Sequence, residues 1–165
     1  MIILVSDTSV LIDLERGGLL EAAFACGHQL VVPDYLYVTE LEPENGPLLK
    51  EMGLNVVELT SEEVEYAQAI RSATPSLTLA DCFALSCARR PEHMLITGDK
   101  TLRSRADGKS VPCRGLLWML DQMELSGAIA TVSLAEGLQK IAAHPRCRLP
   151  KSDVGERLTK WLRKA

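Results

Sequence analysis

The clearest indication of the fold lies in the first fourteen residues, Met1-Ile-Ile-Leu-Val-Ser-Asp-Thr-Ser-Val-Leu-Ile-Asp-Leu14. Residues 2–5 are consecutive apolar residues, mostly β-branched, and they predict a short strand that is buried on both faces, as in a parallel sheet. Polar residues 7–9 break this run, and the apolar spacing over 10–14 predicts a helix. Asp7 is therefore expected where the strand ends, at the sheet edge where α/β proteins build their sites. The alternative for Asp7 is a plain turn and helix cap.

The rest of the chain alternates predicted strands and helices. Short apolar runs predict strands at 29–32, 54–59 and 93–97, with an edge strand at 111–113. The helices expected between and after them cover 19–25, 35–41, 47–52, 60–73, 77–88, 100–105, 115–125, 133–143 and 152–163. This alternation predicts an α/β fold of three layers, in which a mostly parallel sheet of four to five strands lies between two layers of helices.

Three predicted helix starts carry a capping-box pattern, in which a hydroxyl residue precedes an acidic residue by three positions. The pattern occurs at Thr60–Glu63, Thr78–Asp81 and Ser133–Glu136. It places Asp81 in the first turn of its helix, on the edge to which the strand ends point. The alternative for Asp81 is that it only completes the cap. Asp99 follows the strand at 93–97 and is expected to start the next helix.

Length and composition are those of one globular domain. The 165 residues are 47% apolar and 24% charged, and no apolar run approaches the ~18 residues that a membrane span needs. The first residues lack the basic region of a signal peptide. The five cysteines are scattered and odd in number, so we interpret them as reduced thiols of a cytoplasmic protein.

The net charge of −4 conceals two oppositely charged halves. Residues 1–80 hold 3 Lys/Arg and 13 Asp/Glu, a net charge of −10, whereas residues 81–165 hold 15 and 9, a net charge of +6. The basic half is able to form a rim that faces phosphate groups beside an acidic pocket. Ordinary solvated helix faces are the alternative.

Four acidic residues occur at the predicted strand ends and on the adjoining helices: Asp7, Glu40, Asp81 and Asp99. If the first and fourth strands are neighbours, the three aspartates converge at one sheet edge and Glu40 closes the group from the side. Carboxylates gathered in one pocket repel one another, so the cluster requires protons or a cation. Oxygen ligands without His or Cys select Mg²⁺ or Mn²⁺. Such ions activate water and neutralise a phosphodiester, which is the chemistry of a nuclease or a phosphatase.

Four segments together resemble the PIN domain family, and most closely its small VapC-type toxin ribonucleases. They are D-T-S-V-L-I at 7–12, V-T-E-L at 38–41, L-T-L-A-D-C-F-A-L at 77–85 and I-T-G-D-K-T-L-R at 96–103. The resemblance implies an endoribonuclease that depends on Mg²⁺ or Mn²⁺. The residues it assigns are the catalytic and metal-binding acids Asp7, Glu40, Asp81 and Asp99 and the supporting hydroxyls of Ser9 and Thr97.

The resemblance covers roughly residues 2–115, so the residues beyond it depart from the smallest family members, and it also implies partners. A PIN-like core is expected over 1–115, with a C-terminal helical extension over 116–165 packed on the same domain. RNA is the implied substrate, Lys100, Arg103 and Arg105 are candidate contacts to its backbone, and such contacts make binding salt-dependent. A homodimer and a small antitoxin protein are the other implied partners, and no membrane is implied.

Three other classes of protein fit the sequence less well. A haloacid-dehalogenase-like phosphatase needs an Asp-x-Asp pair after the first strand, where this chain has Asp7-Thr8-Ser9, and a receiver domain fits no better. A nucleotide-binding Rossmann domain or P-loop protein lacks its glycine motif here. The alternatives that stay open are a catalytically silent PIN-like binding or regulatory module and another Mg²⁺-dependent phosphohydrolase.

Overall fold

A sheet of five strands forms the centre of the computed structural model, which describes residues 1–164. The strands lie in the order β3-β2-β1-β4-β5, and every pairing between neighbours is parallel. The α/β fold and the parallel sheet expected from the sequence are therefore confirmed. The strands are β1 (Ile3–Ser6), β2 (Gln29–Pro33), β3 (Asn55–Val57), β4 (His93–Ile96) and β5 (Cys113–Arg114).

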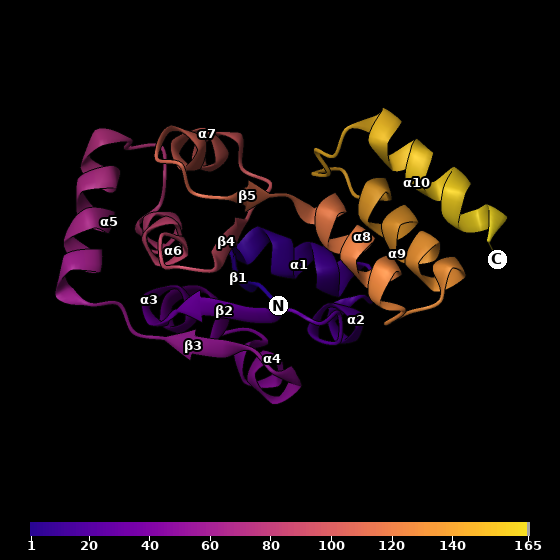
Figure 1. Cartoon of the computed structure of the whole chain (residues 1–165), viewed down its shortest axis with the longest axis horizontal. Helices are drawn as coiled ribbons and strands as arrows, with labels where there is room; N and C mark the ends of the chain where they lie inside the picture. Colours follow the sequence, from indigo (N-terminus) through magenta and orange to yellow (C-terminus); the bar gives the residue numbers. More distant parts are fainter. Residues whose placement is uncertain (165) are drawn as a thin grey trace.

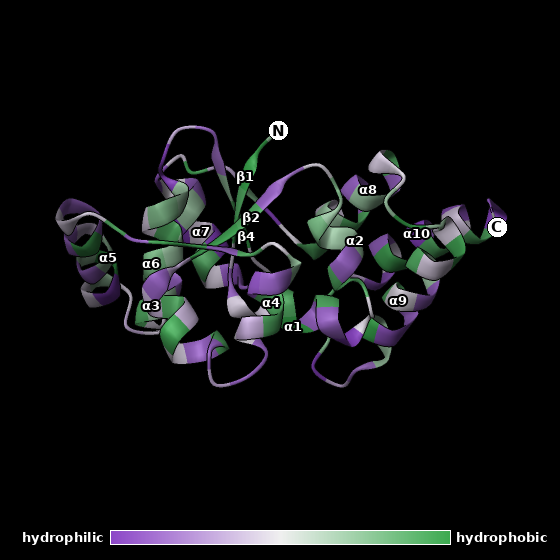
Figure 2. Cartoon of the chain, turned by 90° about the horizontal axis from the view of Figure 1, so that it is seen from below, coloured by the Kyte–Doolittle hydropathy of each residue, from purple (hydrophilic) through white to green (hydrophobic). Residues whose placement is uncertain are grey.

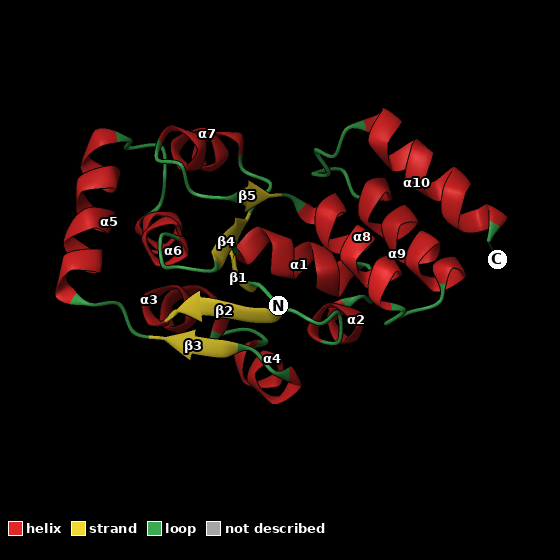
Figure 3. Ribbon diagram, viewed as in Figure 1, coloured by secondary structure: helices red, strands yellow, loops and turns green. Residues whose placement is uncertain are grey.

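Helices cover both faces of this sheet (Figures 1 and 3). They are α1 (Thr8–Arg16), α2 (Leu20–Phe24), α3 (Asp34–Leu36), η1 (Tyr37–Leu41), α4 (Gly46–Met52), α5 (Ser61–Ala73), α6 (Leu79–Ala88), α7 (Lys100–Gly108), α8 (Leu116–Ser126), α9 (Thr131–Ala143) and α10 (Lys151–Arg163). Figure 1 shows α5 and α6 on one side of the central strands and α1, α8, α9 and α10 on the other. Within residues 1–164, no helix has the length and apolar character needed to cross a membrane.

The centre of the core is formed by the apolar runs of β1 and β4. Leu4 and Val5 of β1 are fully buried, as are the last two residues of β4, and β1 is hydrophobic along its length (Figure 2). Burying a side chain of this size contributes about 1.5–3 kcal/mol. Ser6 pairs with Ile96, so the two strands end at the same level of the sheet. The residues that follow them, Asp7 and Thr97, therefore lie side by side on one edge.

Helix α1 runs from that edge to the C-terminal helices. Asp7 caps its start, Gly17 caps its end, and Gly18 turns the chain with a φ of 67°, which glycine adopts without strain. Near its end α1 packs closely against α9, and the contact requires glycine on both helices. A Cβ at Gly17 would lie 3.0 Å from the carbonyl oxygen of Gly137, and a Cβ at Gly137 would lie 2.8 Å from that of Gly17.

Two of the three C-terminal helices pack on the first two helices of the chain, and the third packs on them in turn. α8 contacts α2, α9 contacts α1, and α10 packs on α9. Trp161 of α10 is fully buried. Arg157, also on α10, donates two hydrogen bonds to the carboxylate of Asp121 on α8, at 2.7 and 2.8 Å. The basic last helix is therefore docked on the protein itself.

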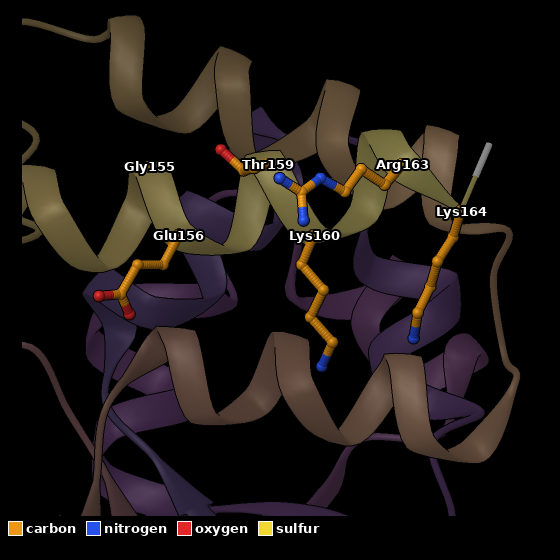
Figure 4. Close-up of a pocket in the computed structure, with 6 residues that line it drawn as sticks. All are labelled: Gly155, Glu156, Thr159, Lys160, Arg163 and Lys164. Atoms are coloured by element: carbon orange, nitrogen blue, oxygen red, sulfur yellow. The ribbon is translucent and has the colours of Figure 1, made fainter.

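A second acidic residue of α8, Glu124, is paired with two lysines of α10. Its side chain is 8% exposed and accepts hydrogen bonds from Lys160 and Lys164, each at 2.8 Å. Figure 4 shows both lysines extending from α10 toward the neighbouring helix. Burial acts to raise the pKa of Glu124, but the hydrogen bonds from the lysines outweigh it and lower the pKa to about 2. Glu124 is therefore a buried carboxylate whose charge is compensated by the protein.

The helix predicted over 35–41 is confirmed as helical, but most of it has π geometry. α3 passes into the π-helix η1, in which the amide of Glu42 donates to the carbonyl oxygen of Tyr37, five residues back. Glu40 lies within this wider turn. The apolar spacing could not reveal it, because one π turn changes the helical period too little over five residues.

Two smaller predictions differ from the structure. The capping boxes at Thr60 and Thr78 are confirmed, but the one at Ser133 is wrong, because α9 already begins at Thr131 and no side chain caps it. The edge strand lies at 113–114 rather than 111–113. Pro112 still takes part through its carbonyl oxygen, which accepts from the amide of Leu95.

Candidate active site

Asp7 lies directly after β1 and is only 3% exposed. Its backbone amide donates to the carbonyl oxygen of Ile96 at 3.1 Å, which continues the β1–β4 pairing by one residue. Its Oδ1 accepts from the amide of Val10 at 2.9 Å, and its Oδ2 accepts from the hydroxyl of Thr97. The carboxylate is thus held between the start of α1 and the end of β4.

The environment of Asp7 disfavours its charge. Burial raises the pKa of Asp7 from 3.8 to about 6. Hydrogen bonds from Thr97, Val10 and Ser9 act against that shift. The nearby charge of Asp81 adds to it. Among residues 1–164 the ion pairs do not include Asp7, so a cation beside it would stabilise the ionised carboxylate.

Thr97 is a fully buried residue whose polar atoms all have partners. Its amide donates to the carbonyl oxygen of Arg114 at 3.0 Å, and its own carbonyl oxygen accepts from Nη2 of Arg103 at 3.0 Å. Its hydroxyl donates to Asp7 and accepts from the amide of Asp99 at 3.0 Å. Thr97 therefore links β5, α7 and two of the predicted site acids.

Asp81 lies in the first turn of α6, as the sequence predicts. The amide of Asp81 donates to the hydroxyl of Thr78 at 3.1 Å, and Oδ2 of Asp81 accepts from the amide of Thr78 at 3.2 Å. α6 packs against both β1 and β4, and the charge of Asp81 is close enough to raise the pKa of Asp7. The capping role of Asp81 and its place beside Asp7 therefore coexist.

Glu40 reaches the same edge from η1. Its Oε1 accepts a hydrogen bond from the hydroxyl of Thr8, the residue next to Asp7 and the first of α1. The sequence expectation that Glu40 approaches the aspartates from the side agrees with this contact. Thr8 was not predicted to contribute, although its position directly after Asp7 was the available signal.

Asp99 and Ser9 complete the set. Asp99 caps α7, because its Oδ1 accepts from the amide of Leu102 at 2.8 Å, and its own amide donates to Thr97. Ser9 is exposed at the start of α1, and its hydroxyl acts to lower the pKa of Asp7. Asp99 thus reaches Asp7 through Thr97, whereas Ser9 lies two residues from Asp7 in the same helix start.

The four predicted acids form one connected set, but they are not drawn into a tight ligand cluster. Across residues 1–164 no group of three or more His, Cys, Asp or Glu side chains is arranged to hold a metal ion. Each carboxylate is engaged locally: Asp81 and Asp99 as helix caps, Glu40 with Thr8, and Asp7 with two donors. In Glu40, Asp81 and Asp99, these contacts use one carboxylate oxygen. The other oxygen of each carboxylate has no hydrogen bond to the described residues.

The three predicted basic contacts all lie on α7, just beyond Asp99. Lys100 is exposed and Arg105 is half-buried. Arg103 differs from both, because its guanidinium is bonded to the Thr97 carbonyl oxygen. Nothing in the sequence around Arg103 predicts that contact.

Comparison with known proteins identifies the family of this fold and site. The PIN domain family model matches residues 3–162, and the chain therefore belongs to the PIN domain family. PIN domains are generally nucleases, which act on nucleic acids and typically use divalent metal ions, so the chain belongs to a class of nuclease-type hydrolases. No curated protein matches the sequence.

Proposed function

We propose that this protein is an endoribonuclease that depends on Mg²⁺ or Mn²⁺ and uses Asp7, Glu40, Asp81 and Asp99 as its catalytic acids. The observation that carries the proposal is Asp7, a buried carboxylate with its pKa raised to about 6, close to Asp81 and without an ion pair to the described residues. Strongly shifted carboxylates at the carboxyl ends of parallel strands are typical of functional sites.

The donor set at this edge fits a hard divalent ion. It consists of carboxylate and hydroxyl oxygens, which Mg²⁺ and Mn²⁺ prefer. Mg²⁺ keeps several waters and commonly binds proteins through one or two carboxylates, so the neighbouring pair Asp7 and Asp81 suffices to begin a site. When bound, the ion supplies positive charge that makes water more acidic and neutralises a phosphodiester.

The remaining roles belong to this chain's own residues. The Thr97 hydroxyl orients the Asp7 carboxylate, and the exposed hydroxyl of Ser9 supports its ionised form. Glu40, held by Thr8, and Asp99, held by its own helix cap, lie where they can accept a proton from a water or orient it. Lys100 and Arg105 on α7 are the proposed contacts to RNA phosphates.

The cellular role that we propose is that of a cytoplasmic toxin of a toxin–antitoxin pair, held in check by a small antitoxin protein and active as a homodimer. This part rests on the resemblance of the four motif segments to VapC-type toxins. Co-purification of the chain with a small protein encoded beside it, and a mass of twice 18.1 kDa in solution, are the expected results. A monomer that slows no cell growth when produced alone would contradict this role.

The proposed chemistry is tested with the purified full chain and a mixed RNA pool in Mg²⁺, Mn²⁺ or EDTA. Cleavage should require the metal. It should fall at least about 100-fold in Asp81→Asn, because the asparagine side chain can still accept the hydrogen bond from the Thr78 amide but carries no charge. Glu63→Gln is the matched control, because Glu63 occupies the same capping position in α5. It should cleave like the wild type.

Metal binding separates the remaining outcomes. Mn²⁺ bound by the wild type and lost in Asp81→Asn supports the site even if the RNA pool lacks the true substrate. Neither cleavage nor Mn²⁺ binding by the wild type would refute the nuclease and leave a PIN-shaped binding module.

A further inference from the structure

We infer that Arg103 is a positioning residue for Asp7, acting through Thr97, rather than a contact to RNA. Its guanidinium holds the carbonyl oxygen of the residue whose hydroxyl holds the Asp7 carboxylate. The inference rests on the proposed nuclease function, and it assigns to Arg103 a role that its place in a basic segment does not indicate.

The peptide that Arg103 holds has few other restraints. Thr97 is the last residue before the chain leaves the sheet, and the next residue, Gly98, is exposed with no atom near the place of a Cβ. Glycine permits many backbone conformations, so Gly98 itself does little to fix the orientation of the Thr97–Gly98 peptide. The bond from Nη2 of Arg103 fixes the carbonyl end of that peptide at 3.0 Å. The Thr97 side chain is thereby kept in place.

Rotation at this point would disturb two hydrogen bonds at once. The Thr97 hydroxyl donates to Asp7 and also accepts from the amide of Asp99, which lies on the other side of Gly98. Moving the peptide shifts Asp99 relative to Thr97 and turns the hydroxyl away from Asp7. Arg103 therefore stabilises the relative positions of two site acids although it contacts neither of them.

The fold makes room for this guanidinium. Gly115, between β5 and α8, lies beside it, and a Cβ there would be 2.7 Å from Nη2 of Arg103. The φ of Gly115 is −107°, a value that alanine also adopts, so the missing side chain serves the arginine rather than the backbone. The guanidinium also lies close enough to Cys113 of β5 for its charge to act on the pKa of that thiol, although burial dominates and raises it. Although Arg103 is exposed as a residue, its charged end is anchored where α7 meets the sheet.

Gly115 provides a variant that separates the two roles of Arg103. Arg103→Ala removes both the charge and the bond to Thr97, whereas Gly115→Ala keeps the charge and displaces the guanidinium from Thr97. Positioning predicts that both variants lower kcat by about 10- to 100-fold, the usual cost of misplacing catalytic groups, with KM within about twofold. Contact with RNA predicts instead that only Arg103→Ala raises KM. That variant would also reduce the slope of the logarithm of the RNA-binding constant against the logarithm of salt concentration by about 0.7. That pattern would overturn the inference.

A second measurement needs neither metal nor RNA. Amide hydrogen exchange of Asp99, whose N–H is bonded to Thr97, should become faster in Arg103→Ala and in Gly115→Ala in EDTA. Lys109→Ala, which removes an exposed charge at the end of the same helix, is the control and should leave exchange and kcat unchanged. Unchanged Asp99 exchange in both test variants would refute the positioning role even in a protein for which no RNA substrate is found. Failure of the nuclease proposal shows separately, as a wild type that binds no Mn²⁺.

Discussion

Asp7 and Glu124 are both buried carboxylates, and the protein treats them in opposite ways. Asp7 is 3% exposed and its pKa is raised to about 6, whereas the side chain of Glu124 is 8% exposed and its pKa is lowered to about 2. The difference lies in their partners. Glu124 accepts from Lys160 and Lys164, while Asp7 accepts only from an amide and hydroxyl groups and has Asp81 nearby.

The comparison shows which part of the molecule is built for stability. The C-terminal helices supply a cation for their buried acid, so its charge is compensated in the folded chain itself. The edge after β1 and β4 compensates Asp7 with neutral donors, which leaves its ionised form less stable than in water. Strongly perturbed carboxylates are typical of functional sites, and a functional site at this edge agrees with membership of the PIN domain family.

The largest expected effect concerns catalysis. Asp7→Asn should lower RNA cleavage at least about 100-fold, equivalent to about 2.7 kcal/mol of transition-state stabilisation, because it removes a charge from the reacting site. Glu124→Gln should cleave within about twofold of the wild type. Initial rates in saturating Mn²⁺ measure both. Equal losses of cleavage in the two variants would show that Asp7 matters no more for catalysis than Glu124.

The next effect is on stability and has the opposite sign. In EDTA at pH 7, Asp7→Asn should be more stable than the wild type by about 1–3 kcal/mol, from a pKa that rises from 3.8 to about 6 on folding. Because the folded pKa is higher, ionisation of Asp7 destabilises the fold as pH rises from about 4 to 6. The gain should therefore vanish near pH 4. Urea unfolding at both pH values tests this, and an equal gain at pH 4 would point to another cause.

A smaller loss is expected at the compensated acid. Glu124→Gln should lower the free energy of unfolding by about 1 kcal/mol at pH 7, because two charged hydrogen bonds lose their acceptor charge. The folded pKa is below the usual 4.5, so this contribution is present above that pH and is lost as pH falls toward 2. Thermal unfolding at pH 7 and pH 3 should show the difference between variant and wild type shrinking. A constant difference would indicate lost packing instead.

The smallest effect belongs to a single lysine. Lys164→Ala should cost no more than about 0.5 kcal/mol, because its side chain is 52% exposed and Lys160 still compensates Glu124. Removing both lysines should cost more than the sum of the single changes, since it leaves the buried Glu124 carboxylate without a cation. A chemical-denaturation cycle of the two single variants and the double variant measures this coupling. Simple additivity would show that the two lysines act independently.

Most of the fold was predictable because its signals are local. The apolar run before Asp7 and the capping boxes at Thr60 and Thr78 depend on residues within four positions of one another. The pairing of β1 with β4 was only a condition for the three aspartates to converge, because the alternation of strands and helices predicts a parallel sheet but not the order of its strands. The C-terminal helices were also expected, apart from the start of α9.

The contacts of the site were less predictable because they are distant in sequence. The Thr8–Glu40 bond needs the π turn of η1, and a single π turn leaves no clear periodic signal. The Arg103–Thr97 bond depends on the register of β4 with β5 and on the space beside Gly115. Roles that depend on charge alone were easier to propose than roles that depend on such geometry.

The close approach of Gly17 and Gly137 gives the C-terminal helices a bearing on the chemistry. α1 is nine residues long, about 14 Å, and a helix of this length is stiff. One end of it starts at Asp7 and the other is seated against α9 with no side chain between the two backbones. A methyl group added at Gly137 would lie 2.8 Å from the carbonyl oxygen of Gly17, so either α9 or the end of α1 would have to move. The absence of two side chains thus lets the C-terminal helices support the far end of the helix that Asp7 caps.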